Sequence, residues 1–176
     1  MEPLDIANNL RDKFLHEVTD IKSFREQVFV SVKREKIMDI CRYLYEDDNI
    51  RMNFLSDLCG VDYPERKYRF EVVYNLYSLK YNHRLIIKAS IPGNDPCINS
   101  VVSVWKGANW HEREACDMYG IVFTGHPDLR RILMPDDWEG FPLRKDYPLK
   151  GPEGVEYRGF EDLKELHGHD NEWNIR

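Results

Sequence analysis

The sequence predicts an α+β protein with a mostly antiparallel sheet, two N-terminal and two C-terminal helices, and an extended proline-rich arm after the last helix. Three observations support this prediction. Apolar residues repeat at helical spacing on both sides of a central region. In that central region, two segments alternate between apolar and polar residues, as strands do. Beyond residue 123 prolines become frequent, with five of the nine between Pro127 and Pro152, so no long helix is expected there.

The first two helices are expected over residues 3–18 and 34–45, with a short strand over residues 27–32 between them. The residue spacing gives each helix one apolar face, which is typical of helices that cover a core. The face of the first helix consists of Ile6, Leu10 and Phe14. The face of the second helix consists of Ile37, Ile40, Cys41 and Leu44.

Three strands are expected next, over residues 51–59, 69–77 and 84–91. The last two show the clearest alternation of apolar and polar residues. Their apolar positions are Phe70, Val72, Tyr74 and Leu76 in one strand and Leu85, Ile87, Ala89 and Ile91 in the other. The link between these two strands is short and polar, which favours an antiparallel hairpin.

The last two helices are expected to begin at Asp95 and Asn109. Asp95 can cap free backbone N–H groups, and Pro96 suits the first helical position, where no donor is needed. The buried face of this third helix would consist of Ile98, Val101, Val102 and Trp105. Asn109 with Glu112 three residues later is close to a capping box, and Gly120 is suited to end the fourth helix.

These elements divide the chain into an α+β domain (residues 1–123), an extended arm (residues 124–150) and an acidic polar tail (residues 151–176). The arm is too apolar for a linker. Its apolar residues are Leu129, Ile132, Leu133, Met134, Trp138, Phe141, Leu143 and Tyr147. The domain is too small to cover all of the apolar surface of the arm, so we expect the arm to dock on a partner polypeptide. The tail has seven Asp or Glu against three Lys or Arg, and we interpret it as a mobile tail or a looser docking arm.

Composition argues against nucleic-acid binding and against direct membrane contact. The net charge is −6 and basic residues are scattered among acidic ones, whereas non-specific nucleic-acid binding needs a concentrated positive surface. No stretch approaches the roughly 20 apolar residues that span a bilayer. The N-terminus carries acidic residues where a signal peptide needs positive charge and an apolar core. We therefore expect an interior compartment, with membrane association only through a partner.

The cysteines do not follow a metal-binding pattern. They are Cys41, Cys59, Cys97 and Cys116. They lie far apart, and none forms the C-x-x-C pair that is typical of zinc and iron–sulfur sites, so we expect free thiols and no metal or cluster. His167 and His169 in the tail could bind a metal, but we interpret them as solvated. No glycine-rich nucleotide motif and no G-x-S-x-G motif is present.

The densest group of functional side chains begins at His111 and Glu112. These two residues match the start of the H-E-x-x-H zinc motif. Ala115 occupies the position of the second histidine, however, so the metalloprotease interpretation fails.

A stand-alone acid/base enzyme is a competing hypothesis for this region. Glu114 and Asp117 share one helix face, as paired catalytic carboxylates require, and His126 could serve as a general base. Arginines close in sequence can neutralise Asp117 instead. They are Arg113, Arg130 and Arg131. A buried charge network that holds the arm is therefore the favoured hypothesis.

Two basic pairs in the arm, Arg130-Arg131 and Arg144-Lys145, could bind phosphate. Acidic residues beside them would repel phosphate. These are Asp128, Asp136, Asp137 and Asp146. Salt bridges to other polypeptides of a complex fit this mixture of charges better.

The region from residue 108 to residue 148 closely resembles one family signature. The matching segments are Ala108-Asn109-Trp110, Glu112-Arg113-Glu114, Asp117-Met118-Tyr119-Gly120-Ile121, Phe123, Gly125-His126-Pro127-Asp128-Leu129-Arg130-Arg131-Ile132-Leu133 and Gly140-Phe141-Pro142-Leu143-Arg144-Lys145-Asp146-Tyr147-Pro148. The pattern is similar to that of the C subunit of the proton-pumping NADH:quinone oxidoreductase, respiratory complex I. The N-terminal half shows only a compatible order of helices and strands.

The resemblance implies a cofactor-free subunit of the peripheral arm of the complex, on the cytoplasmic side of the cell membrane. FMN, iron–sulfur clusters and quinone would bind in partner subunits, which couple NADH oxidation to quinone reduction and proton translocation. The implied partners are the hydrogenase-like D subunit, which helps to form the quinone site, and other peripheral-arm subunits. No catalytic, cofactor-binding or metal-binding residue is implied. The implied docking residues are Glu112, Arg113, Glu114, Asp117, Gly120, His126, Pro127, Arg130, Arg131, Gly140, Pro142, Leu143, Arg144, Lys145, Asp146 and Tyr147.

Two residues depart from the pattern, because His111 and Cys116 stand where many relatives have aromatic side chains. Local packing is expected to differ there. The electron donor is also left open, since a related complex could use ferredoxin or the deazaflavin F420 in place of NADH. The acid/base enzyme stays the alternative from a different class.

Overall fold

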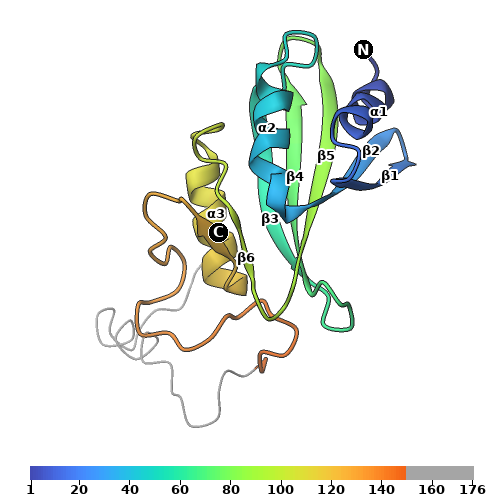
Figure 1. The fold of residues 1–176 in the computed structure, drawn as a ribbon. Coiled ribbons are helices and arrows are strands. Elements are labelled where there is room, and N and C mark those ends of the chain that lie inside the picture. Colours follow the sequence, from blue (N-terminus) through green and yellow to red (C-terminus); the bar gives the residue numbers. More distant parts are fainter. Residues whose placement is uncertain (150–176) are drawn as a thin grey trace, which may run out of the picture.

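The structure, a computed structural model, describes residues 1–149 of the chain. In this part of the chain a five-stranded sheet carries helices α1 (Pro3–Lys13) and α2 (Ile37–Glu46) on one face (Figure 1). Helix α3 (Ala108–Tyr119) lies beside the outer strand β3 (Phe54–Asp62). The predicted α+β class is confirmed.

The large sheet is mixed, although most of its neighbouring strands are antiparallel, as predicted. Its other strands are β1 (Val18–Phe24), β2 (Gln27–Lys33), β4 (Phe70–Ser78) and β5 (His83–Ile91). The spatial order is β1-β2-β5-β4-β3, and only β2 and β5 within this sheet run parallel. β4 and β5 form the predicted hairpin.

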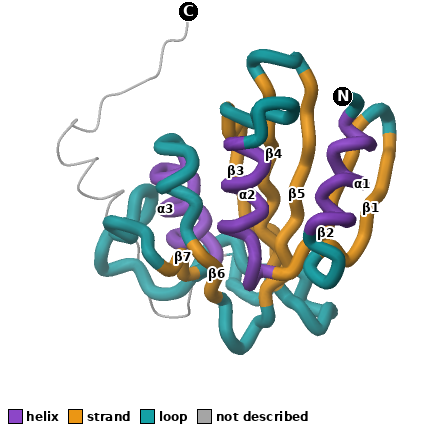
Figure 2. Tube along the Cα trace, turned by 45° about the horizontal axis from the view of Figure 1, so that its top comes forward, coloured by secondary structure: helices purple, strands orange, loops and turns teal. Residues whose placement is uncertain are grey.

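The core lies between the helices and one face of the sheet (Figure 2). Alternate residues of β4 and β5 point toward the helices and are almost completely buried, because successive side chains of a strand point to opposite faces. The helices supply the facing apolar side chains Ile6, Ala7, Leu10, Ile37, Ile40, Cys41 and Leu44. Burial of apolar surface stabilises the fold by roughly 25 cal/mol per Å².

Helix α3 packs closely against β3 at Gly60. A Cβ atom at this position would lie 2.7 Å from Cδ2 of Tyr119, much nearer than van der Waals contact. The glycine therefore allows the last turn of α3 to approach the sheet. That turn is also where the arm is attached.

The first predicted helix was too long. It ends at Lys13, and residues 18–24 form strand β1, which was not predicted. β1 is an edge strand, and only Val18 among its residues is buried. Because the strand pairs with β2 alone and faces solvent, its sequence lacks the alternating apolar pattern that marked the inner strands.

The third predicted helix, from Asp95, is absent from the described chain. In its place β6 (Cys97–Asn99) pairs in parallel with β7 (Val122–Thr124). The Arg34 guanidinium binds the Asp95 carboxylate at 2.5 Å and donates to the Asp95 carbonyl at 2.6 Å, so Asp95 is an ion-pair partner rather than a helix cap. Three of the four predicted apolar residues are nevertheless buried: Ile98, Val101 and Trp105.

The last helix was predicted well at its end and less well at its start. Gly120 follows α3 with φ of 72°, the left-handed conformation that glycine adopts without strain. The helix begins at Ala108 after Gly107, and no side chain caps it. Glu112 does not reach back to Asn109; its carboxylate accepts the N–H of Val101 at 2.7 Å.

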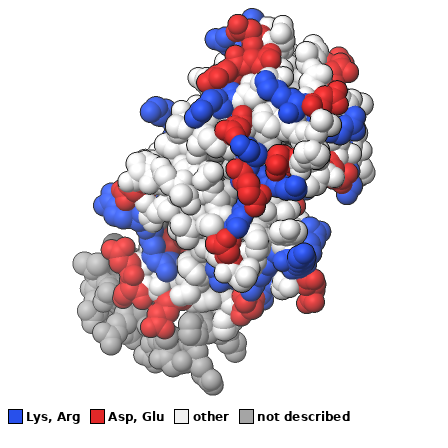
Figure 3. All heavy atoms as spheres, in the orientation of Figure 1, with Lys and Arg blue, Asp and Glu red and all other residues white. Residues whose placement is uncertain are grey.

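None of the helices within residues 1–149 has the length and apolar character that a bilayer span requires. On the face shown in Figure 3, acidic and basic side chains are interleaved and do not gather into a patch of one sign. The predicted acidic tail, with His167 and His169, lies outside the described residues.

Candidate docking site at the base of the arm

The arm leaves β7 and crosses the C-terminal end of α3. Residues 125–149 form neither helix nor strand. Their position is instead fixed by hydrogen bonds and ion pairs to buried carboxylates of the domain. We call the contacts around Asp117 the first anchor and those around Asp62 the second anchor.

The first anchor is a buried carboxylate on α3. The Asp117 side chain has no exposed surface, and one of its oxygens accepts a hydrogen bond from the Arg131 guanidinium at 2.6 Å. The other oxygen accepts the consecutive backbone N–H groups of Ile132, Leu133 and Met134 at 2.9–3.1 Å. Burial acts to raise the pKa of Asp117, but these four donors outweigh burial and the pKa is lowered. Asp117 is therefore an ionised structural group.

Arginines extend the first anchor along the arm. Arg131 also donates to the carbonyls of Trp138 and Gly140, at 3.0 and 3.3 Å. Arg113 on α3 donates to the carbonyls of Arg130 and Arg131, at 3.0 and 2.9 Å. The predicted charge network is thus present, although Arg131 rather than Arg113 neutralises Asp117.

The arm also closes the C-terminal end of α3. The last carbonyls of a helix lack partners within the helix. Here the N–H of Leu143 donates to the carbonyl of Met118 at 3.1 Å, and the Arg144 guanidinium donates to the carbonyl of Tyr119 at 2.6 Å. The guanidinium lies over the ring of Phe141, 4.4 Å from its centre. Burial lowers the pKa of Arg144, while these contacts stabilise its position.

The second anchor joins the end of β3 to the end of the arm. Asp62 has a fully buried side chain and binds Arg69 through both oxygens, at 2.7 and 2.9 Å. It also accepts the N–H of Lys145 at 2.7 Å, and Arg69 binds the Asp146 carboxylate at 2.8 Å. The Arg69 guanidinium is the main reason that the pKa of Asp62 is lowered.

Asp62 and Arg69 were not predicted as site residues. The strand predicted over residues 51–59 stopped before Asp62, so this carboxylate was not placed on an inward-facing position. The sequence did contain a signal. An acidic residue at an inward-facing position of a strand needs a cation nearby, and Arg69 is the first residue of the next predicted strand.

The proposed acid/base residues do not form one site. Glu114 is exposed, whereas Asp117 is buried with both oxygens engaged. His126 is half-buried, with Nε2 3.2 Å from the carbonyl oxygen of Asn109 and Nδ1 accepting the N–H of Asp128 at 2.9 Å. The geometry thus supports a structural role for these residues.

Glu112 lies in the core rather than on the surface of the docking site. It is fully buried, and its second carboxylate oxygen has no hydrogen-bond partner. Burial is the largest influence and raises the pKa of Glu112 to about 7. Burial is also the main reason that the pKa values of the neighbouring Cys41 and Tyr74 are raised, and Glu112 adds to the effect at both.

The remaining predicted docking residues lie along the arm. Arg130 is exposed and pairs with Asp128 at 2.7 Å. The Tyr147 hydroxyl donates to the carbonyl of Glu139 at 3.0 Å, and the Tyr147 ring stacks with Trp138. Pro127 is exposed and Pro142 is half-buried.

Three leucine side chains of the arm are exposed. Leu133 is 60% exposed and Leu143 is 47% exposed, while Leu149 is fully exposed. The backbone of Leu133 and Leu143 is nevertheless fixed, because their N–H groups bind Asp117 and the Met118 carbonyl. The site therefore holds apolar side chains outward on an ordered backbone.

No group of His, Cys, Asp and Glu within residues 1–149 is arranged to hold a metal ion. The four cysteines form no disulfide bond with one another in the described part of the chain. Cys41 is buried on α2, while Cys97 lies on β6 rather than on the predicted helix.

The fold and the site define an α+β protein whose C-terminal arm is clamped onto its last helix by buried carboxylates. Residues 30–153 match the family described as respiratory-chain NADH dehydrogenase, 30 kDa subunit. The NADH-quinone oxidoreductase C subunit of Geobacter sulfurreducens is 50% identical over 151 residues, which cover 85% of this chain and 92% of that protein. The corresponding protein of Roseiflexus castenholzii is 53% identical over 130 residues, which cover 74% and 75%.

Two solved structures have the same fold. A trypsin-resistant fragment of Nqo5 aligns with a TM-score of 0.62 and 32% identity, over 73% of this chain and all of the fragment. A chain of the membrane-bound sulfane sulfur reductase, an archaeal respiratory membrane complex, aligns with a TM-score of 0.71 and 21% identity, over 100% of this chain and 99% of that chain. The chain belongs to the family of the 30 kDa subunit of respiratory-chain NADH dehydrogenase, and the resemblance seen in the sequence is confirmed.

Proposed function

We propose that this chain is a cofactor-free structural subunit in the peripheral arm of an NADH:quinone oxidoreductase, and that it docks on the hydrogenase-like D subunit through its own arm. In this role the chain has no catalytic residue. Electrons pass from NADH through FMN and iron–sulfur clusters in partner subunits to quinone, and quinone reduction is coupled to proton translocation. The chain lies on the cytoplasmic side of the cell membrane as a peripheral part of the complex, and it reaches the membrane only through its partners.

The observation that carries this proposal is that Leu133 and Leu143 have exposed side chains while hydrogen bonds hold their backbone in place. Apolar side chains that an ordered segment holds exposed are suited to contact with a partner. An ordered backbone also reduces the conformational entropy that binding must remove. Asp117 and Asp62 thus act from inside the domain, while Leu133, Leu143 and Leu149 supply the contact surface.

The proposal is tested by co-expression of the full chain with the hydrogenase-like D subunit of the same organism and purification through a tag on the chain. A Leu133→Glu/Leu143→Glu variant is expected to recover at least tenfold less of this partner, because two carboxylates would be buried without counter-charges. A Leu15→Glu/Leu79→Glu variant is the matched control, since those leucines are 67% and 64% exposed outside the arm. Equal recovery by both variants, with both folded by circular dichroism, would contradict the proposal.

The same structural role in a ferredoxin- or F420-dependent complex is the alternative, because the fold also occurs in an archaeal respiratory complex. The names of relatives at about 50% identity favour NADH. Oxidation of NADH, but not of reduced ferredoxin or reduced F420, by the purified complex that contains this chain would decide between them.

A further inference from the structure

One face of the large sheet is covered by α1 and α2, and the opposite face carries a mixed row of aromatic and polar side chains. Strand pairing places residues from all five strands side by side on this face. One row consists of Phe24, Gln27, Arg84, Tyr77 and Phe54, and the next consists of Lys22, Phe29, Ile86, Asn75 and Asp57. Phe24 and Phe54, at the two ends of the first row, are 62% and 47% exposed.

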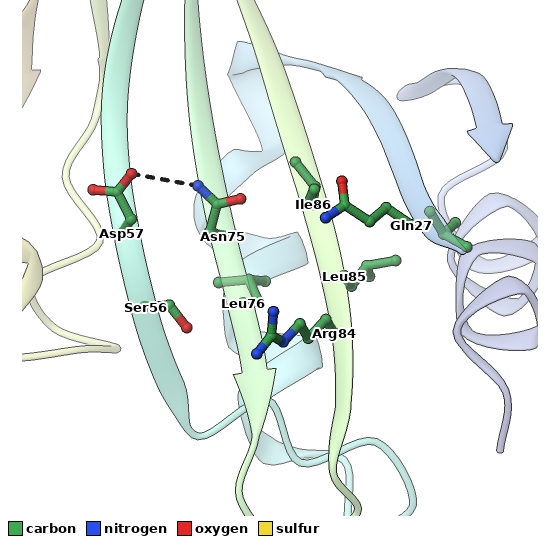
Figure 4. A pocket seen from close by; sticks show the side chains of 9 residues that line it. Gln27, Ser56, Asp57, Asn75, Leu76, Arg84, Leu85 and Ile86 are labelled. Carbon is green, nitrogen blue, oxygen red and sulfur yellow. Dashed lines mark hydrogen bonds between the residues drawn. The ribbon is translucent and has the colours of Figure 1, made fainter. Parts of the chain in front are cut away.

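A pocket of about 280 Å³ lies where these two rows meet (Figure 4). Its wall is made by Gln27 from β2, Arg84 and Ile86 from β5, and Asn75 from β4. A β-bulge between Leu55 and Asp57 places an extra residue, Ser56, at the rim of the pocket. Figure 4 shows the Arg84 side chain extending from β5 toward β4, and Asn75 turned toward Asp57.

Arg84 is the uncompensated charge of this pocket. Within residues 1–149 no carboxylate lies within ion-pair distance of Arg84, whose guanidinium lies 5.6 Å from the centre of the Tyr77 ring. The other cations in the central part of this face do have partners. Lys22 pairs with Asp20 at 2.9 Å, and Lys88 pairs with Glu71 at 3.6 Å.

Among the described residues that line the pocket, the single acid is Asp57, and its carboxylate contacts other groups. Asp57 lies 3.5 Å from His111 on α3 and accepts a hydrogen bond from Asn75 at 3.5 Å. The pocket therefore presents donors at its centre, namely the Arg84 guanidinium and the Gln27 amide, beside the apolar Ile86. A guanidinium binds a carboxylate through two parallel hydrogen bonds, and arginine with aromatic neighbours is typical of the energetic centre of an interface.

We propose that this pocket receives an Asp or Glu side chain from a neighbouring subunit. Apolar residues next to that acid in the neighbouring subunit would cover Ile86 and Phe54. This second docking surface rests on the proposed function, since it requires the chain to be part of a complex. It is separate from the arm, so the chain would join two neighbours or two parts of one neighbour. A protein carboxylate fits better than a phosphate backbone, because Asp20, Asp57 and Glu71 on the same face would repel a polyanion.

The test uses the whole complex purified from native membranes, with the chain carrying the photo-cross-linker benzoylphenylalanine in place of Phe54. The expected product joins this chain to another subunit at a peptide that contains Asp or Glu. The same probe in place of Tyr45, on the helix-covered side, is the control and is expected not to label that peptide. Arg84→Glu should reduce the cross-link by roughly tenfold or more, because two carboxylates would then face each other in the interface, and like charges weaken an interface strongly.

Arg42→Glu is the matched charge reversal, since Arg42 is exposed on α2. It is expected to leave the cross-link unchanged. The inference is overturned if the chain is present in the complex but Phe54 probes label no other subunit, if they label RNA or a second copy, or if Arg84→Glu behaves like Arg42→Glu. Absence of the wild-type chain from the purified complex would instead overturn the proposed function, so the two failures can be told apart.

Discussion

At the residue scale, the two buried carboxylates of α3 differ because their hydrogen-bond donors differ. Asp117 has four donors and a lowered pKa. Glu112, five residues earlier, has the Val101 N–H and the Ser100 side chain as donors, and one of its oxygens has no hydrogen-bond partner. Burial therefore dominates at Glu112 and favours its neutral form. The same helix thus carries one acid that is stabilised in its ionised form and one that is stabilised in its neutral form.

The first prediction concerns the pH dependence that Glu112 creates. Its pKa rises from 4.5, the usual value, to about 7 in the folded chain, so the folded state holds a proton that the unfolded state releases. The stabilisation is complete below pH 4.5 and is lost as the pH rises through 7, by up to about 3 kcal/mol. Urea unfolding of wild type at pH 5 and pH 8 measures this loss.

Glu112→Gln keeps an acceptor for Val101 but cannot ionise. We expect the stability of this variant to change less between pH 5 and pH 8 than that of wild type. Glu114→Gln, an exposed change on the same helix, should retain the wild-type profile. A wild-type slope in the Glu112→Gln variant would show that another group titrates.

The second prediction is that Asp117→Asn destabilises the protein by about 3 kcal/mol at pH 7, because Arg131 loses its charge partner and an amide N–H faces backbone donors. Since the pKa of Asp117 is lowered by folding, its contribution is present above the unfolded pKa and is lost as the pH falls through the folded one. The difference from wild type should therefore shrink in acid. Asp128→Asn, which removes an exposed pair with Arg130, should leave the unfolding midpoint unchanged.

At the element scale, the inner strands and the helix faces could be predicted because local periodicity marks them. Tyr74 and Ile87 follow an alternation that any inward-facing strand shows, and Leu10 and Leu44 lie on apolar helix faces. Residues 95–99 could not be predicted in this way. Their extended conformation depends on Arg34, which is more than sixty residues away in sequence. Contacts between residues so far apart in the chain do not produce a periodic pattern of apolar and polar residues in the local sequence.

The same distinction applies to the docking site. The acid Asp117 and the arginine Arg131 could be linked from the signature, since they lie close in sequence. Asp62 and Lys145 are 83 residues apart and meet only because β3 ends beside the arm. The N–H groups that bind Asp117 were also beyond sequence reasoning, since a backbone donor is present at almost every position.

The third prediction concerns the junction of α3 and the arm at Gly120. A Cβ there would lie 2.5 Å from the Arg144 guanidinium and from the Phe141 ring, and φ of 72° disfavours other residues. Gly120→Ala should destabilise the protein by more than about 1 kcal/mol and make the arm more sensitive to trypsin. Gly107→Ala is the matched control, because its φ is −63° and nothing lies within 4 Å of its Cβ position. Equal effects would mean that the junction is not tightly packed.

At the scale of the whole molecule, two anchors on different elements hold one segment. Asp117 belongs to α3 and Asp62 belongs to β3; Leu133 lies at the contact with Asp117, and Leu143 lies between the two anchors. A segment fixed at both ends loses less freedom on binding than one fixed at a single end. If the anchors act together, breaking either one should release much of what the other holds.

The last prediction tests this coupling by a double-mutant cycle with Asp62→Asn and Asp117→Asn. Once one anchor is broken, the arm is partly free and the second anchor has less structure left to stabilise. We therefore expect the double variant to lose less stability than the sum of the single variants, by about 1 kcal/mol, measured by urea unfolding at pH 7. Distant independent sites normally add to within about 0.5 kcal/mol. Additive losses would mean that each anchor holds its own stretch of the arm, and that the arm does not behave as one ordered unit for docking.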